Sequence, residues 1–189
     1  MTSASYAARP APPRLSAPWS LRTASPEGPE LDTVREWMRR PHVEEFWHQA
    51  WDRQRWQDEW RDQLAGDHVT PCVASYEDEL LAYVEIYRVS RDVLAGHYSV
   101  EPHDVGVHLA VGDVARTGRG LGRRLLRELS TSLLEADPRC VRVVAEPDVR
   151  NAPSVKAFTA AGFRTCGTIE LPDKTAVLCV YPRAEKDLP

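Results

Sequence analysis

His108 and Asp148, together with three closely spaced glycines, are the residues whose types and positions could do chemistry. A histidine can take or give a proton near neutral pH. A carboxylate can orient an imidazole, raise its basicity or hold an incoming amine. The glycines at 118, 120 and 122 let the backbone close around an anion without side-chain collisions. The elements around these residues decide what they do.

The glycines lie between a predicted strand and a predicted helix. In 105–111, valine and leucine alternate with glycine, histidine and alanine, which is the period of a strand. Leucines then recur at 121, 125, 126, 129, 133 and 134, the spacing of an amphipathic helix. A helix start carries unpaired N–H groups and partial positive charge, so this strand, loop and helix predict a phosphate-binding site.

Two common nucleotide-binding motifs do not fit the glycine turn. A P-loop ends in Gly-Lys-Ser/Thr, whereas Gly122 is followed by two arginines. A dinucleotide-binding fold places G-x-G-x-x-G after an early strand, whereas these glycines are spaced two and two and follow three predicted strands. Taken alone, the turn is also compatible with an ordinary connection from strand to helix.

The neighbouring segments predict a mixed sheet. A short strand from Trp19, a hairpin of 69–76 and 80–89, and the strand 105–111 form an antiparallel meander. The leucine-rich helix leads to a buried strand at 140–145, and a strand–helix–strand unit makes its two strands parallel. His108 then lies on the polar side of one strand. Asp148 follows the end of its partner, where ligand sites gather in open sheets.

A further helix is expected from Asn151, which can cap it, to Gly162, which can stop it. Two closing strands follow at 164–171 and 175–181. Upstream, a helix is expected from Leu31 to about residue 40, where Pro41 stops it.

Tryptophans are concentrated in the predicted helical region 42–65. Trp47 and Trp51 are four residues apart, as are Trp56 and Trp60, so each pair is expected to share a helix face. Most of these rings should pack the helices onto the sheet. Alternatively, some wall a substrate groove, because aromatic surfaces suit aliphatic chains and cations. The candidates for such substrate contacts are Trp47, His48 and Trp51.

Composition limits the remaining possibilities. The 189 residues, 42% hydrophobic and 28% charged, suit one globular domain with a real core. A net charge of -4, with no basic block outside the glycine turn, argues against a nucleic-acid partner. The four cysteines form no C-x-x-C pair, which argues against structural zinc and for buried thiols in a reduced, cytoplasmic protein. Neither a membrane span nor a signal peptide is expected.

With the 151–163 helix beside the glycine turn, the sequence resembles the GNAT superfamily of acyl-CoA N-acyltransferases. The family's glycine motif lies over Thr117 to Gly122, and its Asn…Gly-Phe helix lies over Asn151 to Phe163. GVHLAVGD, TGRGLGRRLL, VVAEPDVRN and ELPDK together resemble the siderophore branch. That branch includes the lysine, hydroxylysine and hydroxycadaverine N-acyltransferases of mycobactin, aerobactin and desferrioxamine assembly.

The resemblance covers residues 19–183, and it implies an α+β fold. A mostly antiparallel sheet would be splayed at the parallel strand pair and flanked by helices. Residues 1–18, rich in proline and alanine, are expected to be a flexible tail because they bury little apolar area. Residues 184–189 are expected to be a short C-terminal tail.

Acyl-CoA is the co-substrate that the resemblance implies, with no metal; the acyl group would be acetyl, succinyl or longer. An acyl carrier protein is an alternative donor. The pantetheine would lie in the splay, and the pyrophosphate would lie on the glycine turn. The implied cofactor-binding residues are Leu109, Val111, Arg116, Gly118, Arg119, Gly120, Leu121, Gly122, Arg123, Asn151 and Ser154.

Two positions depart from the family pattern. Thr117 stands where Gln or Arg is usual, with Arg116 one place earlier, and binding through the backbone should be unaffected. Phe158 stands where many members carry a tyrosine that protonates the leaving thiolate. Phenylalanine has no proton to donate, so water or another side chain must do so, or the thiolate leaves unprotonated.

The resemblance carries catalytic roles onto His108 and Asp148. Glu146 and Asp173 are further candidates, either as structural residues or as substrate contacts. The implied reaction is acyl transfer to the amine or hydroxylamine of a lysine- or cadaverine-like molecule in siderophore biosynthesis. An amine attacks only when neutral, so an ammonium substrate needs a base.

Two alternatives stay open. Aminoglycoside 6'-N-acetyltransferases carry the same helix motif, so an aminoglycoside is a second acceptor class. A non-catalytic acyl-CoA-binding module is the third reading, and Phe158 is its best support. The sequence shows no dimer face, so a monomer is expected.

Overall fold

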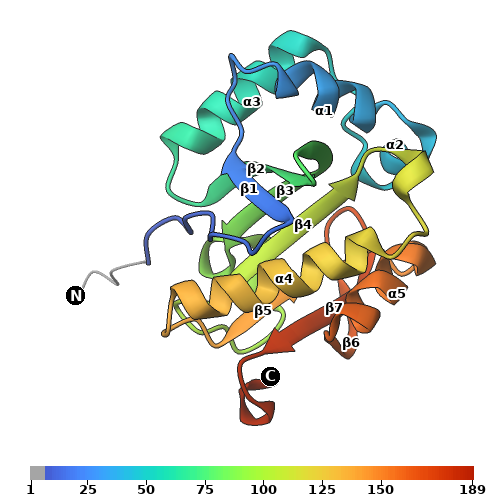
Figure 1. The fold of residues 1–189 in the computed structure, drawn as a ribbon. Helices are drawn as coiled ribbons and strands as arrows, with labels where there is room; N and C mark the ends of the chain where they lie inside the picture. Colours follow the sequence, from blue (N-terminus) through green and yellow to red (C-terminus); the bar gives the residue numbers. More distant parts are fainter. Residues whose placement is uncertain (1–6) are drawn as a thin grey trace.

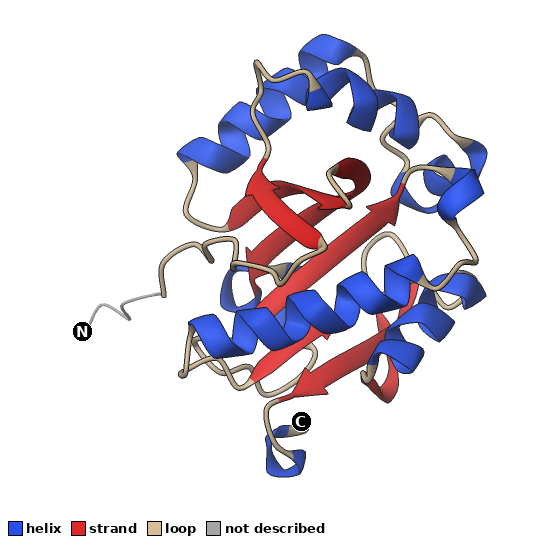
Figure 2. Cartoon of the chain, viewed as in Figure 1, coloured by secondary structure: helices blue, strands red, loops and turns tan. Residues whose placement is uncertain are grey.

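A computed structural model describes residues 7–189, which form one mixed sheet with helices on both faces (Figures 1 and 2). The sheet has seven strands in the order β1-β2-β3-β4-β5-β7-β6. The strands are β1 Trp19–Thr23, β2 Val69–Tyr76, β3 Glu79–Arg88, β4 Val105–Val111, β5 Arg142–Ala145, β6 Arg164–Glu170 and β7 Thr175–Pro182. The helices are α1 Glu30–Met38, α2 Pro41–Trp47, α3 Arg53–Ala65, α4 Leu121–Ala136 and α5 Ala152–Ala161. The expected α+β fold is confirmed.

Alternation along the strands divides the core between the two faces of the sheet. On one face, Val84 and Val107 pack with the leucines of α4. On the other, Tyr83 and Ala110 pack with α1 and with the two buried tryptophans of α3. Because successive strand residues point to opposite faces, His108 shares the face of Ala110 and lies on the side of α1 to α3. The first four strands form the predicted antiparallel meander.

The sheet opens between β4 and β5. These strands are parallel, as predicted, but they pair only at Val105 with Val143 and at Gly106 with Val144. Beyond Gly106, β4 continues to Val111 while β5 ends at Ala145. The second half of β4 therefore has no β5 partner, and the predicted splay is confirmed.

Gly106 stands at this branch point because a side chain would not fit. A Cβ built there would lie 2.0 Å from the ring of Tyr87, its neighbour across the β3–β4 pairing. The absent side chain lets that ring lie flat on the sheet beside His108.

The tryptophan region differs from the sequence-based expectation. Trp56 and Trp60 share one face of α3 and are fully buried, as predicted. The prediction that Trp47 and Trp51 share a helix face is wrong, because α2 ends at Trp47 with His48 in the left-handed region at φ 52°. A new helix then begins after Asp52, whose side chain accepts from the N–H of Arg55.

The ends of the other helices lie close to the positions that the sequence predicts. Pro41, expected only to stop a helix, also opens α2 at its first position, where a missing N–H costs nothing. Asn151 caps α5 by accepting from the N–H of Ser154, and Gly162 ends that helix at φ 114°, both as predicted.

The described part of the expected N-terminal tail contacts the domain. Residues 7–18 contain no helix or strand, but Arg9 donates to the carbonyls of Gln63 and Leu64 at the end of α3. Leu15 is 8% exposed and belongs to the core beneath α4. The segment thus differs from the flexible tail expected, and residues 1–6 of that expectation lie outside the described residues. None of the helices between residues 7 and 189 is both long and apolar enough to cross a membrane.

Candidate active site

His108 lies between two carboxylates at the point where β4 and β5 separate. Its Nδ1 is 2.9 Å from Oε2 of Glu85, which lies directly opposite on β3. Its Nε2 is 2.5 Å from Oε1 of Glu146, which follows the last residue of β5. The imidazole side chain is 34% exposed, whereas the two carboxylates are nearly buried. The ring therefore joins the two strands across the opening and still reaches the surface.

Glu85 is held by one hydrogen-bond donor from its own strand and one from α3. Its Oε1 accepts from the hydroxyl of Tyr83 at 3.0 Å and from the side-chain amide of Gln63 on α3 at 3.0 Å. The hydroxyl of Tyr83 in turn accepts from Nε1 of Trp60 at 3.1 Å. The α3 tryptophan cluster thus supports the site from beneath.

Glu146 is held from the opposite side. Its Oε2 accepts from the hydroxyl of Tyr87 at 2.7 Å, and Nζ of Lys174 lies 3.6 Å from its Oε1. Tyr87 also packs against the imidazole, with ring centroids 4.7 Å apart. Lys174 comes from the turn between β6 and β7, so this turn closes one side of the site.

These contacts set the protonation of the histidine. Burial alone lowers the pKa of His108, but the neighbouring charges of Glu146 and Glu85, and the hydrogen bonds to them, raise it to about 10. Burial raises the pKa of Glu146, and the charge of His108 outweighs it, so that this pKa is lowered. The same balance of burial against His108 lowers the pKa of Glu85. At neutral pH the resting site is an imidazolium between two carboxylates.

Asp148 lies beyond this trio, in the turn between β5 and α5. It forms an isolated bridge to Ala176 of β7, and its side chain is 7% exposed. Its carboxylate accepts from Nε of Arg150 at 3.0 Å and from Nη2 at 2.6 Å, and these hydrogen bonds lower the pKa of Asp148. The carboxylates that contact His108 are Glu85 and Glu146, and Asp148 does not contact the imidazole.

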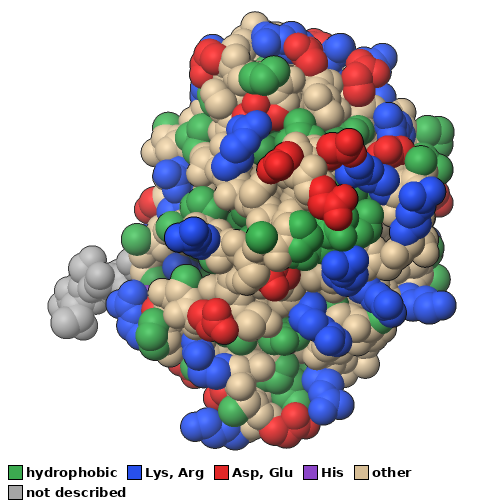
Figure 3. All heavy atoms as spheres, in the orientation of Figure 1, with side chains coloured by type: hydrophobic (Ala, Val, Ile, Leu, Met, Phe, Trp, Pro, Cys, Tyr) green, Lys and Arg blue, Asp and Glu red, His purple; other side chains and the backbone are tan. Residues whose placement is uncertain are grey.

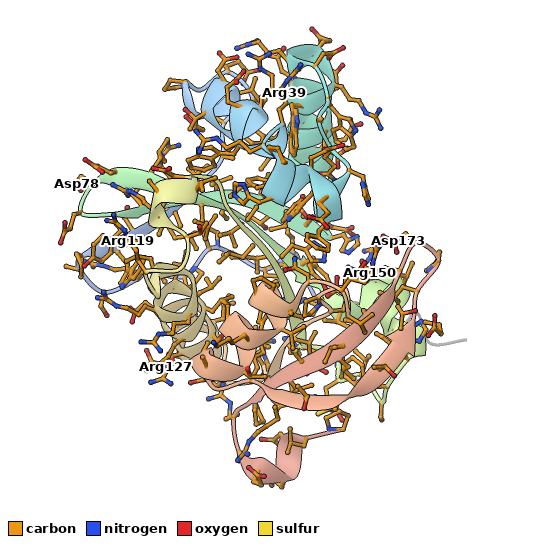
Figure 4. The ribbon with its side chains drawn as sticks, turned by 90° about the vertical axis from the view of Figure 1, so that its right-hand side faces the viewer. Arg39, Asp78, Arg119, Arg127, Arg150 and Asp173 are labelled. Carbon is orange, nitrogen blue, oxygen red and sulfur yellow. The ribbon has the colours of Figure 1, made fainter. Side chains whose placement is uncertain are left out.

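The residues predicted to contact substrate lie at different distances from this centre. The ring centroid of Trp47 is 6.1 Å from that of His108, so it walls the site. His48 is exposed at the end of α2, and Trp51 packs on Trp56 and stacks under Arg55. Asp173 is exposed in the β6–β7 turn, and Figure 4 shows it on the same side of the molecule as Arg150.

The start of α4 has the features of an anion site. Gly118 and Gly120 have φ of 71° and 76°, a region that favours glycine. No side chain caps the helix, which leaves its first N–H groups without intrahelical acceptors. Arg119 and Arg123 are exposed, and Figure 3 shows Lys and Arg side chains gathered over this end of α4. Arg116 instead forms ion pairs with Glu79 and Asp113.

The remaining residues of the predicted cofactor site lie on β4 and at the start of α5. Leu109 and Val111 are half-buried on the unpaired part of β4, on the side of α4. Asn151 and Ser154 lie at the start of α5, where their mutual hydrogen bond is 3.1 Å. Phe158 is 5% exposed and packs edge-on against Phe163, so its role is in the core. Within residues 7–189, no cluster of three or more His, Cys, Asp or Glu side chains could hold a metal ion.

Three residues of the site were missed by sequence reasoning: Glu85, Tyr87 and Lys174. The strand 80–89 contains a glutamate between two tyrosines, Tyr-Val-Glu-Ile-Tyr, in an otherwise apolar stretch. A charge in such a strand requires a partner. The hairpin and meander register would then have placed Glu85 opposite His108.

Comparisons with known proteins agree with this geometry. A family model described as an acetyltransferase (GNAT) domain matches residues 28–171. Lysine N-acyltransferase MbtK of Mycobacterium sp. (strain MCS) is 35% identical over 182 residues, which cover 95% of this chain and 74% of that protein. N(6)-hydroxylysine O-acetyltransferase of Escherichia coli is 30% identical over 171 residues, covering 90% of this chain and 54% of that protein.

Solved structures give the same fold. An uncharacterized protein from Bacillus halodurans superposes with a TM-score of 0.81 at 30% identity, covering 87% of this chain and 84% of that one. Aminoglycoside acetyltransferase AAC(6')-Ib in complex with coenzyme A superposes with a TM-score of 0.78 at 27% identity, covering 87% of this chain and 95% of that one.

Proposed function

The chain belongs to the GNAT acetyltransferase family, and we propose that it transfers an acyl group from a CoA thioester to the amine or hydroxylamine of a lysine-like molecule in siderophore biosynthesis. The observation that carries the proposal is His108, held between Glu85 and Glu146 where β4 and β5 separate. The relatives named for lysine and N(6)-hydroxylysine support this acceptor class. We assign the activity to residues 19–183.

The chain has a place for the acyl donor. CoA, when bound, supplies the activated thioester. The unpaired half of β4 offers backbone groups to an extended ligand, and the first N–H groups of α4 suit a pyrophosphate. Arg119 and Arg123 add positive charge at the same end. The similarity to AAC(6')-Ib, solved with coenzyme A, supports this placement.

The acceptor is expected to arrive as an ammonium, and to bind it must replace one of the cations that Glu146 and Asp148 hold in the free protein, Lys174 and Arg150. One proton must leave before the nitrogen can attack. Nε2 of His108, once its own proton has passed to solvent, takes the first proton of the ammonium, assisted by the Glu146 carboxylate that shares its hydrogen bond. The neutral nitrogen then attacks the thioester, the C–N bond forms, the C–S bond breaks, and the second N–H proton leaves to solvent. Phe158 has no proton to give, so water protonates the departing thiolate.

Gly120→Ala tests the donor site. A side chain at φ 76° costs about 1–2 kcal/mol, and its Cβ would lie 3.1 Å from Nε of Arg123. We expect CoA affinity, measured by calorimetry, to fall by about tenfold, the equivalent of 1.4 kcal/mol. Gly96→Ala is the matched control, because nothing lies within 4 Å of its Cβ. Equal CoA affinity in both variants would show that the glycine turn is not part of the donor site.

An aminoglycoside is the second candidate acceptor, favoured by the fold similarity to AAC(6')-Ib. The acidic groups of this site are largely matched by cations, however, since Lys174 faces Glu146 and Arg150 binds Asp148. A polycationic drug binds more favourably to unpaired carboxylates than to carboxylates that are already paired with cations.

A panel of acceptors separates the two classes. Lysine, N6-hydroxylysine, hydroxycadaverine and kanamycin would each be offered with acetyl-, succinyl- and long-chain acyl-CoA, and release of free CoA would be measured. We expect kcat/KM for the lysine-like acceptors to exceed that for kanamycin by about 10²-fold or more, a difference of 2.7 kcal/mol in the transition state. A preference for kanamycin would assign the chain to drug acetylation. CoA binding without turnover on any amine would favour a binding module.

A further inference from the structure

We infer that Glu85 is a positioning residue for the acyl transfer: it fixes the imidazole of His108 and keeps a proton on Nδ1, which leaves Nε2 as the ring atom that exchanges a proton. This inference rests on the proposed function for its catalytic meaning. The position of the proton on Nδ1 is a property of the free protein and is tested separately.

The direction of each hydrogen bond around Glu85 follows from the buried indole N–H of Trp60. Trp60 and Tyr83 are completely buried, and an indole N–H can only donate. Trp60 therefore donates to the oxygen of Tyr83, and the hydroxyl proton of Tyr83 points to Glu85. The side-chain amide nitrogen of Gln63 also donates to Glu85.

Glu85 thus receives two donors on Oε1 and is left with Oε2 for the imidazole. A nearly buried carboxylate that accepts from several donors is held in its ionised form. Oε2 then requires a donor, and Nδ1 at 2.9 Å is that donor. The proton on Nδ1 is consequently fixed by a chain of contacts that begins in the core of α3.

Nε2 occupies a different environment. Its partner Glu146 lies at the open end of the strand pair and also faces Tyr87 and Lys174. An acceptor ammonium can displace Lys174 from this carboxylate, whereas Glu85 is held by the side chains of Tyr83 and Gln63. The titratable and charged groups that face His108, directly or through the groups around its two carboxylate partners, are Glu85, Glu146, Tyr83, Tyr87, Lys174, Glu59, Asp148 and the buried thiols of Cys72 and Cys179.

The first measurement is an NMR titration of the His108 ring in the free protein, with the signal assigned by its loss in His108→Ala. Glu85→Gln removes the charge and keeps the shape, so we expect the pKa of His108 to fall by about 1 to 3. Glu59→Gln is the matched control. It removes a carboxylate bonded to the same Gln63 amide but not to the imidazole, and the His108 pKa should change little.

The second measurement is the pH profile of kcat/KM. If the proton on His108 must leave before the amine can be deprotonated, the rising limb should move to lower pH in Glu85→Gln and stay in place in Glu59→Gln. Glu85→Asp keeps the charge but withdraws the carboxylate from Nδ1. We expect kcat to fall by about 10²-fold with acceptor KM little changed, because misplacement of a catalytic group acts on the chemical step.

The outcomes separate the two proposals. A His108 pKa that is the same in Glu85→Gln and wild type, or an unchanged kcat in Glu85→Asp, would overturn the role of Glu85. If Glu85→Gln fails to fold, Glu85→Asp carries the test alone through its kcat. If the wild-type protein acylates no amine, the proposed function falls, and the titration still decides whether Glu85 holds the proton on Nδ1.

Discussion

His108→Ala is expected to lower turnover by about 10²-fold or more, the usual scale for a general acid–base group. The substitution removes the ring atom that exchanges the acceptor's proton, and it also removes the cation between two nearly buried carboxylates. Glu85 and Glu146 would then repel one another, and one of them would take up a proton. The loss should appear in kcat with saturating donor, while CoA affinity stays within about threefold of wild type because the α4 turn is untouched.

A second histidine–carboxylate pair provides the control. Nδ1 of His103 is 2.9 Å from Oδ2 of Asp137, with a comparable side-chain exposure, at the far end of α4. His103→Ala should keep full turnover, so a loss shared by both variants would point to general destabilisation. Full activity of His108→Ala with a lysine-like acceptor would remove His108 from the reaction.

The sequence alone was sufficient to predict the strands and helices that surround the site. Alternation in 105–111 and the leucine spacing after Leu121 are local patterns, and a strand–helix–strand unit has one allowed hand and a parallel pairing. From these alone, His108 and the region after β5 could be brought together. Helix ends were equally accessible, because Asn151 and Gly162 act on their own backbone neighbours.

The position of Trp51 and the partner of His108 could not be predicted in this way, because they depend on structure that local sequence patterns do not encode. Trp47 and Trp51 have helical spacing, yet α2 ends at Trp47 and His48 takes the left-handed conformation, so Trp51 lies outside that helix. Glu85 became visible as a partner of His108 only through the register between β3 and β4. Register depends on the whole meander, because a slip of one residue would send every side chain to the opposite face.

The catalytic role of Asp148 stays a prediction, and the structure shows no contact between its carboxylate and the imidazole. Asp148 follows the partner strand, but it lies two residues beyond Glu146, in the turn before α5. Glu146 takes the contact with Nε2, and Asp148 turns to Arg150. We propose that the two carboxylates act separately, Glu146 on the proton and Asp148 on the charge of the acceptor.

Asp148→Asn is expected to lower kcat/KM for the acceptor by about 10²-fold, while the donor KM stays unchanged. Asparagine keeps an oxygen for the backbone N–H of Arg150, now 2.8 Å from Oδ1, so the turn should persist. What disappears is the negative charge, and the guanidinium left behind repels an incoming ammonium. The loss should therefore grow as salt is lowered, because the exposed guanidinium of Arg150 is screened at high ionic strength.

Two further variants test whether Asp148 acts through its charge or through its shape. Asp148→Asn combined with Arg150→Gln removes the opposite charges together, so part of the acceptor affinity should return. Glu170→Gln removes an exposed carboxylate on β6 that bonds Thr175, and it should leave acceptor kinetics unchanged. If the double variant is no better than Asp148→Asn, the carboxylate acts by geometry and its electrostatic role is wrong. If Asp148→Asn retains wild-type acceptor kinetics, the residue only shapes the turn between β5 and α5.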